Sequence, residues 1–370
     1  MNEFKFTLMR GGTSKGVFFL DEDMPSDRSR WEEFLLDVMG SPDARQIDGL
    51  GGANPLTSKA AIVKRSDLGC ADVDYTFAQV SLTGGTVDFK SNCGNISSAV
   101  GPYSVNKCLV RVSDGRAAIR IFNTNTKKII VSEFEARGGR FIERGNTSIP
   151  GVPGAASPVT LLFDNPKGAV TGKLLPTGRP VDLIETSRGK LAVSIVDSAN
   201  PLVFMRACDI GLDGTELPAE FSSEMLLYIE EVRSIAAEMC NLSPRADATK
   251  KTPAVPNSTI VGPPKPYVSS DGSAHAAAEM DISVRMMAMQ RPHDALAITG
   301  AICIATASSI EGTLVNEIAP RGGPAALRIA HPGGIMETEL RFGASGVDGV
   351  KVLRTARSIA HGTVYTKGDY

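Results

Sequence analysis

The segment Gly94-Asn95-Ile96-Ser97-Ser98-Ala99-Val100-Gly101-Pro102-Tyr103 is small or apolar on nearly every side, apart from Ser97 and Ser98. A second segment of this kind, His293–Ser308, stands in the other half of the chain. A helix that is apolar all round belongs in the interior of a domain. The sequence therefore predicts two buried helices, one in each half, and the first of them begins at Gly94.

Short segments with the two-residue periodicity of strands surround both helices. The clearest are Phe4–Met9, Val17–Leu20, Val73–Phe77, Ala118–Phe122, Ile129–Phe134 and Ser258–Val261. Two amphipathic helices are also expected, one around Trp31–Leu36 with Ser26 as its N-cap and Gly40 as its stop, and one over Pro218–Leu242. The predicted fold class is α+β, with two similar units that each wrap a curved sheet around a central buried helix.

The chain has 370 residues, more than a single core usually holds, which favours two domains. We expect a first unit over residues 1–182, to which the C-terminal segment 355–370 is a candidate addition, and a second unit over 183–354. The Pro- and Gly-containing stretch Lys173–Pro180 is the expected crossing between them.

The net charge is only −2 and the basic residues are scattered, so the chain lacks the electrostatic footprint of a nucleic-acid-binding protein. No apolar run approaches the ~20 residues that span a bilayer, and Met1–Phe6 contains no signal-peptide h-region. We therefore expect no nucleic-acid partner, no membrane association and a cytoplasmic location. The sequence leaves a homodimer open.

The six cysteines and four histidines form no pattern typical of a disulfide framework or a metal site. No C-x-x-C pair occurs, and the histidines lack the i, i+4 and H-x-x-E-H spacings. The chain also lacks a G-x-S-x-G nucleophile elbow, a Walker A motif and a dinucleotide-binding G-x-G-x-x-G after a strand. These observations favour acid–base chemistry by side chains alone, without a metal or an organic cofactor.

Cys93, in Ser91-Asn92-Cys93-Gly94-Asn95, is the strongest candidate for chemistry. It stands just before the first buried helix, where free N–H groups and the positive end of the helix dipole stabilise a thiolate. Gly94 and Asn95 permit close approach of a ligand, so this turn, with Asn92 beside it, could also hold a carboxylate. The alternative interpretation is a capped helix start whose cysteine only packs, and the local sequence does not decide between the two.

The loop within Met9–Gly16 lies between two predicted strands and offers groups for an anionic substrate. Arg10 can contact a carboxylate through two hydrogen bonds. Further donors are supplied by Thr13, Ser14 and Lys15. A plain hairpin turn with solvated charges explains the same residues equally well.

A second glycine-containing loop, Gly49–Lys59, carries the hydroxyls of Thr57 and Ser58 and the amine of Lys59. A partly desolvated lysine beside a substrate titrates closer to neutrality, which makes Lys59 a candidate acid or base opposite Cys93. The alternative is an exposed loop lysine without a role in chemistry.

The second half of the chain supplies candidates for a second wall of the site. They are Asn200 after a strand-like run, His293 and Thr299 at the second buried helix, and His331 and Gly333 in a turn. Each has an ordinary structural interpretation as well, because a lone histidine or a strand-ending asparagine is usually structural.

Taken together, four ordered motifs resemble the PrpF family, which includes 2-methylaconitate cis-trans isomerase, 3-methylitaconate delta-isomerase and 4-oxalomesaconate tautomerase. The motifs are Met9–Gly16, Ser41–Gly52, Leu56–Lys59 and Asn92–Asn95. The resemblance continues through Asp72–Tyr75, Asn123–Thr126, Pro176–Gly178, Glu311–Asn316 and His331–Gly334, and so covers nearly the whole chain.

This resemblance implies a diaminopimelate epimerase-like fold and an acid–base pair formed by Cys93 and Lys59, without a cofactor. The epimerases of this fold present a second catalytic cysteine, whereas the region from His293 to Gly300 offers none, and Cys303 lies deep in the predicted helix. A symmetric two-thiol racemase is therefore disfavoured.

The expected reaction is proton transfer on a small unsaturated di- or tricarboxylate, as a double-bond shift or a cis-trans isomerisation. Methylitaconate and 2-methylaconitate are the first substrates to consider, and 4-oxalomesaconate and aconitate are alternatives. A non-catalytic carboxylate-binding protein would share the same loops, and only turnover separates it from an enzyme.

Overall fold

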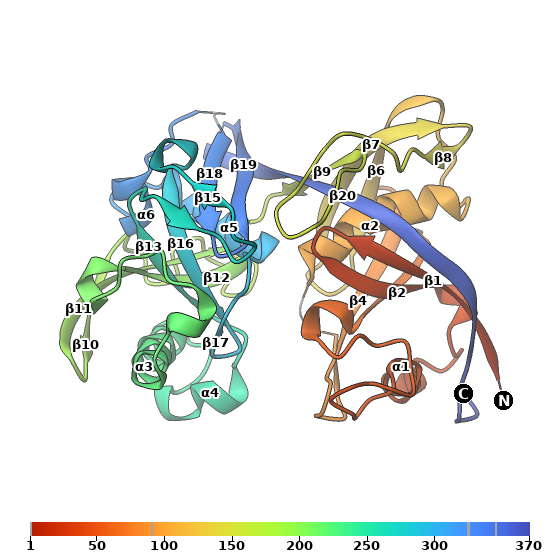
Figure 1. Ribbon diagram of the computed structural model, residues 1–370, viewed down its shortest axis with the longest axis horizontal. Helices are drawn as coiled ribbons and strands as arrows, with labels where there is room; N and C mark the ends of the chain where they lie inside the picture. Colours follow the sequence, from red (N-terminus) through yellow and green to blue (C-terminus); the bar gives the residue numbers. More distant parts are fainter. Residues whose placement is uncertain (1, 90–91, 324–325, 345) are drawn as a thin grey trace. The chain divides into compact units, whose positions relative to one another are not determined.

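The computed structural model describes residues 2–89, 92–323, 326–344 and 346–370. It divides into two compact units (Figure 1). Unit 1 comprises Met1–Asp164 together with Leu353–Tyr370, and unit 2 comprises Asn165–Val352. Each unit has its own sheet and its own central helix, and each is described by itself.

The division between the units differs from the boundary expected at residue 182. Asp182 begins strand β10 (Asp182–Thr186), which pairs antiparallel with β11 (Gly189–Ser198) inside unit 2. The Pro- and Gly-rich stretch expected as the crossing is also held within unit 2, because Asp197 N donates to Leu174 O over 2.9 Å. Hydrogen bonds to the strands that follow hold this stretch in unit 2. Composition does not reveal such bonds.

Unit 1 is a curved sheet around one helix. Its strands are β1 (Glu3–Gly11), β2 (Ser14–Leu20), β3 (Lys59–Arg65), β4 (Val73–Val80), β5 (Val87–Asp88), β6 (Gly115–Asn123), β7 (Lys128–Arg137), β8 (Arg140–Phe141) and β9 (Pro158–Asp164). The hairpin β1–β2 is followed by a parallel β2–β3 pair, an antiparallel β3–β4 pair, a parallel β4–β6 pair and the antiparallel β6–β7 hairpin. The last strand, β20 (Gly346–Tyr365), begins in unit 2 and pairs with β1 in unit 1.

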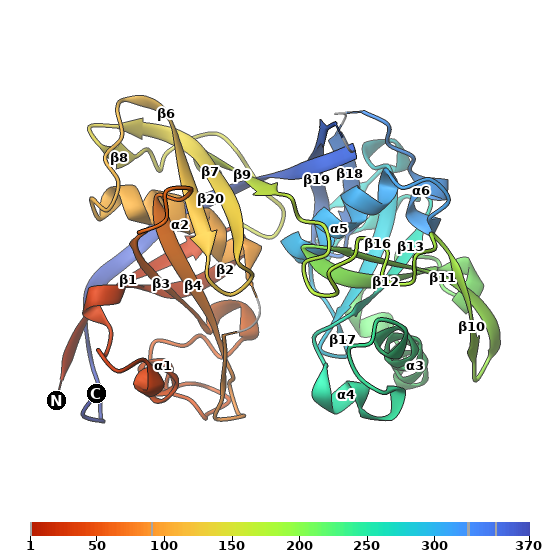
Figure 2. The ribbon, with the colours of Figure 1, turned by 180° about the vertical axis from the view of Figure 1, so that it is seen from behind.

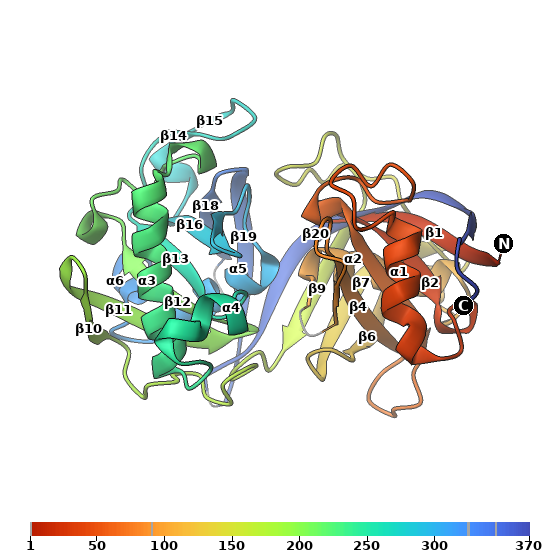
Figure 3. The ribbon, with the colours of Figure 1, turned by 90° about the horizontal axis from the view of Figure 1, so that it is seen from below.

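Two helices cover opposite faces of this sheet. Helix α2 (Gly94–Asn106) is buried at every position from Gly94 to Val105 and lies against several strands of its unit (Figure 2). Helix α1 (Trp31–Met39) packs Phe34 and Leu35 against the other face and ends at Gly40, whose φ of 71° suits glycine (Figure 3). The predicted buried helix that begins at Gly94 is confirmed.

Unit 2 repeats this plan. Its strands are β10, β11, β12 (Asn200–Arg206), β13 (Asn257–Gly262), β14 (Tyr267–Val268), β15 (Ala274–His275), β16 (Ile282–Ala288), β17 (Arg291–Pro292), β18 (Ala326–His331) and β19 (Gly334–Gly343), and its helices are α3 (Ser223–Met239), α4 (Ala248–Lys251), α5 (Ile298–Ser308) and α6 (Leu314–Ile318). The pairs β11–β12, β12–β13, β13–β16, β16–β18 and β18–β19 are antiparallel, parallel, antiparallel, parallel and antiparallel in turn. This is the pairing order of unit 1, so the prediction of two similar units is confirmed.

Three local predictions need correction. Helix α5 starts at Ile298 rather than at His293, because the chain first forms the short strand β17 and a loop. The helix expected from Pro218 starts at Ser223, capped by the Ser222 hydroxyl, which accepts from Met225 N. Ser26 caps no helix, since the Asp27 side chain caps the turn before α1.

Within the part of the chain that the structure describes, no helix is long and apolar enough to cross a membrane. The same residues hold no group of three or more His, Cys, Asp or Glu side chains placed to bind a metal ion.

Candidate functional site

Cys93 occupies the N-cap position of α2 and is half-buried. Its Sγ lies 3.9 Å from Ser14 Oγ, at the start of β2. The thiol makes no capping hydrogen bond to the described residues, while the Cys93 carbonyl accepts from Ser97 N and from Ser97 Oγ. The backbone carbonyl of Cys93, rather than its thiol, therefore bonds to the first turn of the helix.

The turn between β1 and β2 is built onto the start of α2. A Cβ on Gly11 would lie 2.4 Å from Asn95 O, and a Cβ on Gly12 would lie 2.2 Å from Asn95 Oδ1. Gly12 also has a positive φ of 51°. Asn95 Nδ2 donates to Thr13 Oγ1 over 3.1 Å, and Thr13 N donates to Asn95 Oδ1 over 3.4 Å. These glycines are therefore explained by close packing of the helix start.

Lys59 is the first residue of β3 and is 7% exposed. It pairs with Gly16 on β2 and with Gln79 on β4. A Cβ on Gly16 would meet Ile96 of α2, so this cross-strand row faces the central helix. Ser14, two residues before Gly16, projects from the same face. The interpretation of Lys59 as an exposed loop lysine is wrong.

Two side chains of β4 contact the Lys59 amine. Its Nζ donates to Gln79 Oε1 over 2.5 Å and lies 5.3 Å from the centroid of the Phe77 ring. Both neighbours are neutral, so they orient the amine without neutralising it.

Two other predicted site residues of unit 1, Arg10 and Lys15, lie on the β1–β2 hairpin. Arg10 Nη1 donates to Gly12 O and Thr355 O, each over 2.9 Å. Burial, and then the charge of Arg357, lower the pKa of Arg10 from its ordinary value. Because successive side chains point to opposite faces of a strand, Lys15 projects from the face opposite that of Ser14.

The two hydroxyls ahead of Lys59 also serve their own loop. Thr57 Oγ1 donates to Asn54 O over 3.1 Å. Ser58 Oγ is buried between Gln46 Oε1 and Asn54 O, at 2.7 and 2.8 Å. These contacts fix the backbone that leads into Lys59.

A polar network lies on the other side of Cys93. Asn123 Nδ2 donates to Asn92 Oδ1 over 2.8 Å, and Asn92 Oδ1 lies 3.5 Å from Ser97 Oγ. Tyr75 is fully buried, and burial, followed by the nearby Cys93, raises its pKa well above the ordinary value. Ser91, the first residue of the motif, lies outside the described residues.

In unit 2, two predicted site segments meet just before α5. Gly333 packs against Asp294 O and Ala295, and its N–H donates to His331 Nδ1 over 3.1 Å. His293 Nδ1 accepts from Ala295 N over 2.9 Å. Thr299, the second residue of α5, is half-buried. His293 and Gly333 thus share one region with the start of α5, although His293 lies in a loop rather than in the helix.

Asn200 begins β12 and has a different neighbourhood. Its Nδ2 donates to Asn257 Oδ1, and Asn257 Nδ2 donates to Met287 O over 3.0 Å. The hairpin that carries Asn200 contacts the C-terminal half of α5, where Ser198 Oγ lies 2.8 Å from Thr306 Oγ1. No local sequence pattern links Asn200 to Asn257, because the two residues are 57 positions apart in the chain.

Comparison with known proteins identifies the relatives of this chain. The family model described as PrpF protein matches residues 1–367. The chain belongs to the PrpF family.

Three curated relatives cover nearly the whole chain. It is 53% identical to "Putative isomerase YraM" of Bacillus subtilis (98% of each chain), 40% identical to "3-methylitaconate isomerase" of Eubacterium barkeri (97% and 96%) and 39% identical to "(4E)-oxalomesaconate Delta-isomerase" of Novosphingobium (96% of each). A crystal structure of methylitaconate-delta-isomerase matches with a TM-score of 0.88 at 40% identity, over 99% of this chain and 96% of that one. This PrpF-family chain is an isomerase.

The fold has more distant neighbours as well. A probable proline racemase from Agrobacterium radiobacter matches with a TM-score of 0.56 at 12% identity, over 99% of this chain and 93% of that one. This likeness concerns the fold, and it confirms the predicted epimerase-like architecture.

The central helix of unit 2 carries no thiol at its start in this PrpF-family chain. Its N-cap is Ala297, and Cys303 lies inside α5, fully buried, with Sγ 3.2 Å from Val196 O. Burial, followed by the negative charge of Asp197, raises the pKa of Cys303 far above its ordinary value. The prediction that Cys303 is deep in the helix is confirmed.

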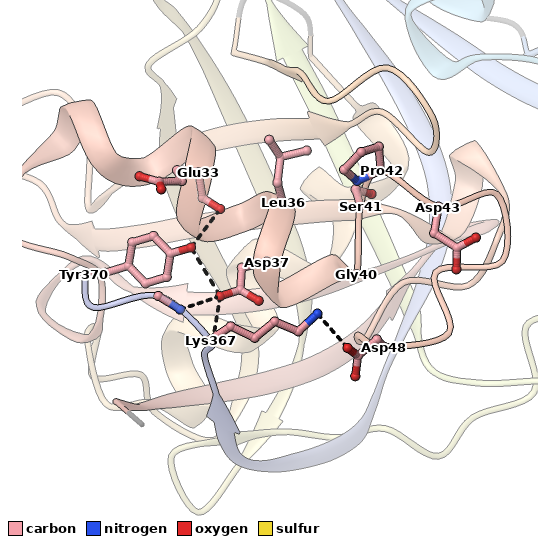
Figure 4. A pocket seen from close by; sticks show the side chains of 11 residues that line it. Glu33, Leu36, Asp37, Gly40, Ser41, Pro42, Asp43, Asp48, Lys367 and Tyr370 are labelled. Atoms are coloured by element: carbon pink, nitrogen blue, oxygen red, sulfur yellow. Dashed lines mark hydrogen bonds and ion pairs between the residues drawn. The ribbon is translucent and has the colours of Figure 1, made fainter.

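Unit 1 also has a surface groove of about 650 Å³ between the end of α1 and the C-terminal segment (Figure 4). Asp37 accepts from Lys367 N, Gly368 N and the Tyr370 hydroxyl, and Lys367 Nζ forms an ion pair with Asp48 over 2.6 Å. Four carboxylates line the groove against one lysine, a charge balance that repels carboxylate ligands. The groove anchors the C-terminus, and Cys93 lies elsewhere, at the start of α2.

Sequence reasoning missed three residues: Tyr75 near Cys93, Asn123 bonded to Asn92, and Gln79 bonded to Lys59. Tyr75 and Asn123 fall inside motifs shared with the PrpF family, which was the available signal. Gln79 carried no such signal, because only the β3–β4 register places it opposite Lys59.

Proposed function

We propose that this chain isomerises a small unsaturated di- or tricarboxylate by proton transfer through Cys93 and Lys59, without a cofactor. The observation that carries the proposal is the pairing of a half-buried thiol at the start of α2 with a buried lysine on the strand face turned to that helix. A thiol and an amine supply two different proton-transfer groups at one site.

The reaction needs two proton transfers. A base removes the allylic proton beside a carboxylate, and the C–H electron pair moves into a dienolate. An acid then returns a proton at the far end of the three-carbon system, or at the same carbon after rotation. Cys93 and Lys59 fill these two roles, in an order that the proposal leaves open.

The dienolate charge requires hydrogen-bond donors that are in place before the reaction. The N–H groups at the start of α2, at Gly94 and Asn95, are suited to this role because the helix dipole concentrates positive potential there. Ser14 and Thr13 adjoin the same turn. Each well-placed donor contributes on the order of 2–4 kcal/mol to stabilising such a charge.

The relatives support the proposed substrate class. Proteins named for 3-methylitaconate and for (4E)-oxalomesaconate are 40% and 39% identical to this chain, so identity alone does not choose between the two acids. We place methylitaconate and 2-methylaconitate first, and 4-oxalomesaconate and aconitate second.

The test is turnover of these acids, followed by absorbance of the conjugated product, for the wild type and Lys59→Ala. We expect one acid to be isomerised and turnover of Lys59→Ala to fall at least ~100-fold while the fold persists. Turnover in deuterium oxide should place deuterium at the migrating position. Binding of these acids without any turnover would instead indicate a carboxylate-binding protein, and full activity of Lys59→Ala would remove Lys59 from the mechanism.

A further inference from the structure

Cross-strand pairing places a neutral amide side chain next to Lys59. Lys59 on β3 stands opposite Gln79 on β4, which in turn stands opposite Asp88 on β5. The Lys59 side chain is nearly buried, and its Nζ donates to Gln79 Oε1. An amide is thus the direct hydrogen-bond partner of the candidate acid–base amine.

The orientation of this amide is set by the loop that precedes β3. Gln79 Nε2 lies 3.1 Å from Pro55 O and 3.0 Å from Ser58 O, and both of these atoms can only accept. A flipped amide would place its oxygen against two carbonyl oxygens and its NH₂ group against an ammonium. The hydrogen bonds therefore require that Oε1 faces Lys59.

The surroundings of Lys59 contain few charged groups. From β2, Ser14 and Gly16 face it, whereas Lys15 projects to the opposite strand face. From β4, Gln79 Oε1 accepts from the Lys59 amine, and the centroid of the Phe77 ring lies 5.3 Å from Lys59 Nζ. Asp88 is the carboxylate of the same row, and it is exposed. Among the described residues, no carboxylate lies within ion-pair distance of Lys59.

We propose that Gln79 is a positioning residue that aims the Lys59 amine through a neutral acceptor in place of a carboxylate. An adjacent carboxylate favours the ammonium form strongly, whereas a neutral acceptor holds the amine in place and lets it gain or lose a proton. This inference deepens the proposed function and rests on Lys59 being an acid–base group. It explains why a buried lysine is paired with glutamine rather than with aspartate or glutamate.

The decisive variant is Gln79→Glu, which keeps the side-chain length and adds one charge. Lysine labelled with ¹³C at Cε reports the protonation of each amine by NMR, and the Lys59 signal is identified by its loss in Lys59→Arg. We expect the Lys59 titration midpoint in Gln79→Glu to rise by at least about one pH unit. Ser113→Glu adds the same charge at an exposed position of unit 1 and should leave the midpoint unchanged. An unchanged midpoint in Gln79→Glu overturns the proposal.

Gln79→Met removes the hydrogen bond without adding charge, and it covers the case in which Gln79→Glu does not fold. With 3-methylitaconate, 2-methylaconitate and 4-oxalomesaconate as probes, we expect kcat to fall about tenfold or more while KM changes less than about threefold. Wild-type kcat in folded Gln79→Met contradicts the positioning role. If Lys59→Ala is inactive but both Gln79 variants behave as wild type, the proposed function stands and this inference fails.

Discussion

The starts of the two central helices differ, although the two units share one architecture. Both helices follow a two-residue strand, β5 before α2 and β17 before α5, and both begin without a side-chain cap among the described residues. The N-cap of α2 is Cys93, whereas that of α5 is Ala297. A shared strand order therefore does not imply the same side chain at the start of the central helix.

The hairpins beside these helices differ as well. In unit 1 the β1–β2 turn packs on the start of α2 through Gly11 and Gly12, whereas in unit 2 the β11–β12 hairpin bonds to the far half of α5 through Ser198. Lys59 and Asn257 both begin the strand parallel to the second hairpin strand. A titratable amine in unit 1 is thus replaced by an amide in unit 2.

The largest expected effect separates the two thiols of the central helices. Cys93→Ser should lower kcat at least ~100-fold, because a hydroxyl is a far weaker acid than a thiol at this position. Cys303→Ser should change kcat less than about threefold, because that thiol is buried and bonded to Val196 O. Steady-state kinetics on the acid that the wild type isomerises measures both. Comparable losses in the two variants would contradict a single-thiol mechanism.

The next effect concerns the packing of unit 1 only. Gly11→Ala places a Cβ 2.4 Å from Asn95 O, a backbone atom that cannot move freely, and should lower the free energy of unfolding by about 1–3 kcal/mol. Urea unfolding followed by circular dichroism measures the change. Gly69→Ala is the matched control, since its Cβ meets no heavy atom within 4 Å in the described part of the chain. Equal stability of both variants would show that the turn yields to the added atom.

A smaller effect concerns the pKa of the buried Cys240 thiol in unit 2. Burial, followed by the charges of Asp197 and Asp182, raises the pKa of Cys240 to about 12. The folded state keeps this proton above the ordinary thiol pKa while the unfolded state loses it, so stability falls as pH rises from about 9 towards 12.

Cys240→Ala should reduce the alkaline loss of stability between pH 9 and 11 by about 1–2 kcal/mol, measured by urea unfolding at both pH values. Cys208→Ala, which removes an exposed thiol of the same unit, is the control and should leave the pH slope unchanged. An identical slope in Cys240→Ala would mean that this thiol ionises alike in both states.

The smallest effect concerns the hairpin turn of unit 2. Ala199 has a φ of 61°, a left-handed conformation that costs an L-residue about 1 kcal/mol, whereas the corresponding turn of unit 1 uses Gly12. Ala199→Gly should therefore change the free energy of unfolding by less than about 1 kcal/mol, in the stabilising direction. Thermal unfolding resolves the sign. A clear loss of stability would indicate that the Ala199 methyl group contributes packing that outweighs the strain.

Much of the fold followed from local pattern. The apolar run from Gly94 predicted α2, and the alternating segments Val73–Phe77 and Ile129–Phe134 fall within β4 and β7. The start of α5 was misplaced because His293–Ala297 is apolar enough to continue the helix but is held in a loop by the bond from His293 N to Met286 O. Hydrophobic periodicity indicates which residues are buried, but it does not indicate which hydrogen bonds end a helix or strand.

The sequence by itself determined that a cysteine stands at the head of a buried helix, that a lysine follows a glycine-containing loop, and that the motifs belong to one family. Only the tertiary structure decided that Lys59 is buried, that Gln79 faces its amine and that Gly11 and Gly12 support the helix start. Composition and periodicity act over a few neighbouring residues. Strand register and side-chain contact join residues 20 to 82 positions apart, and these long-range pairings bring the segments of the candidate site together.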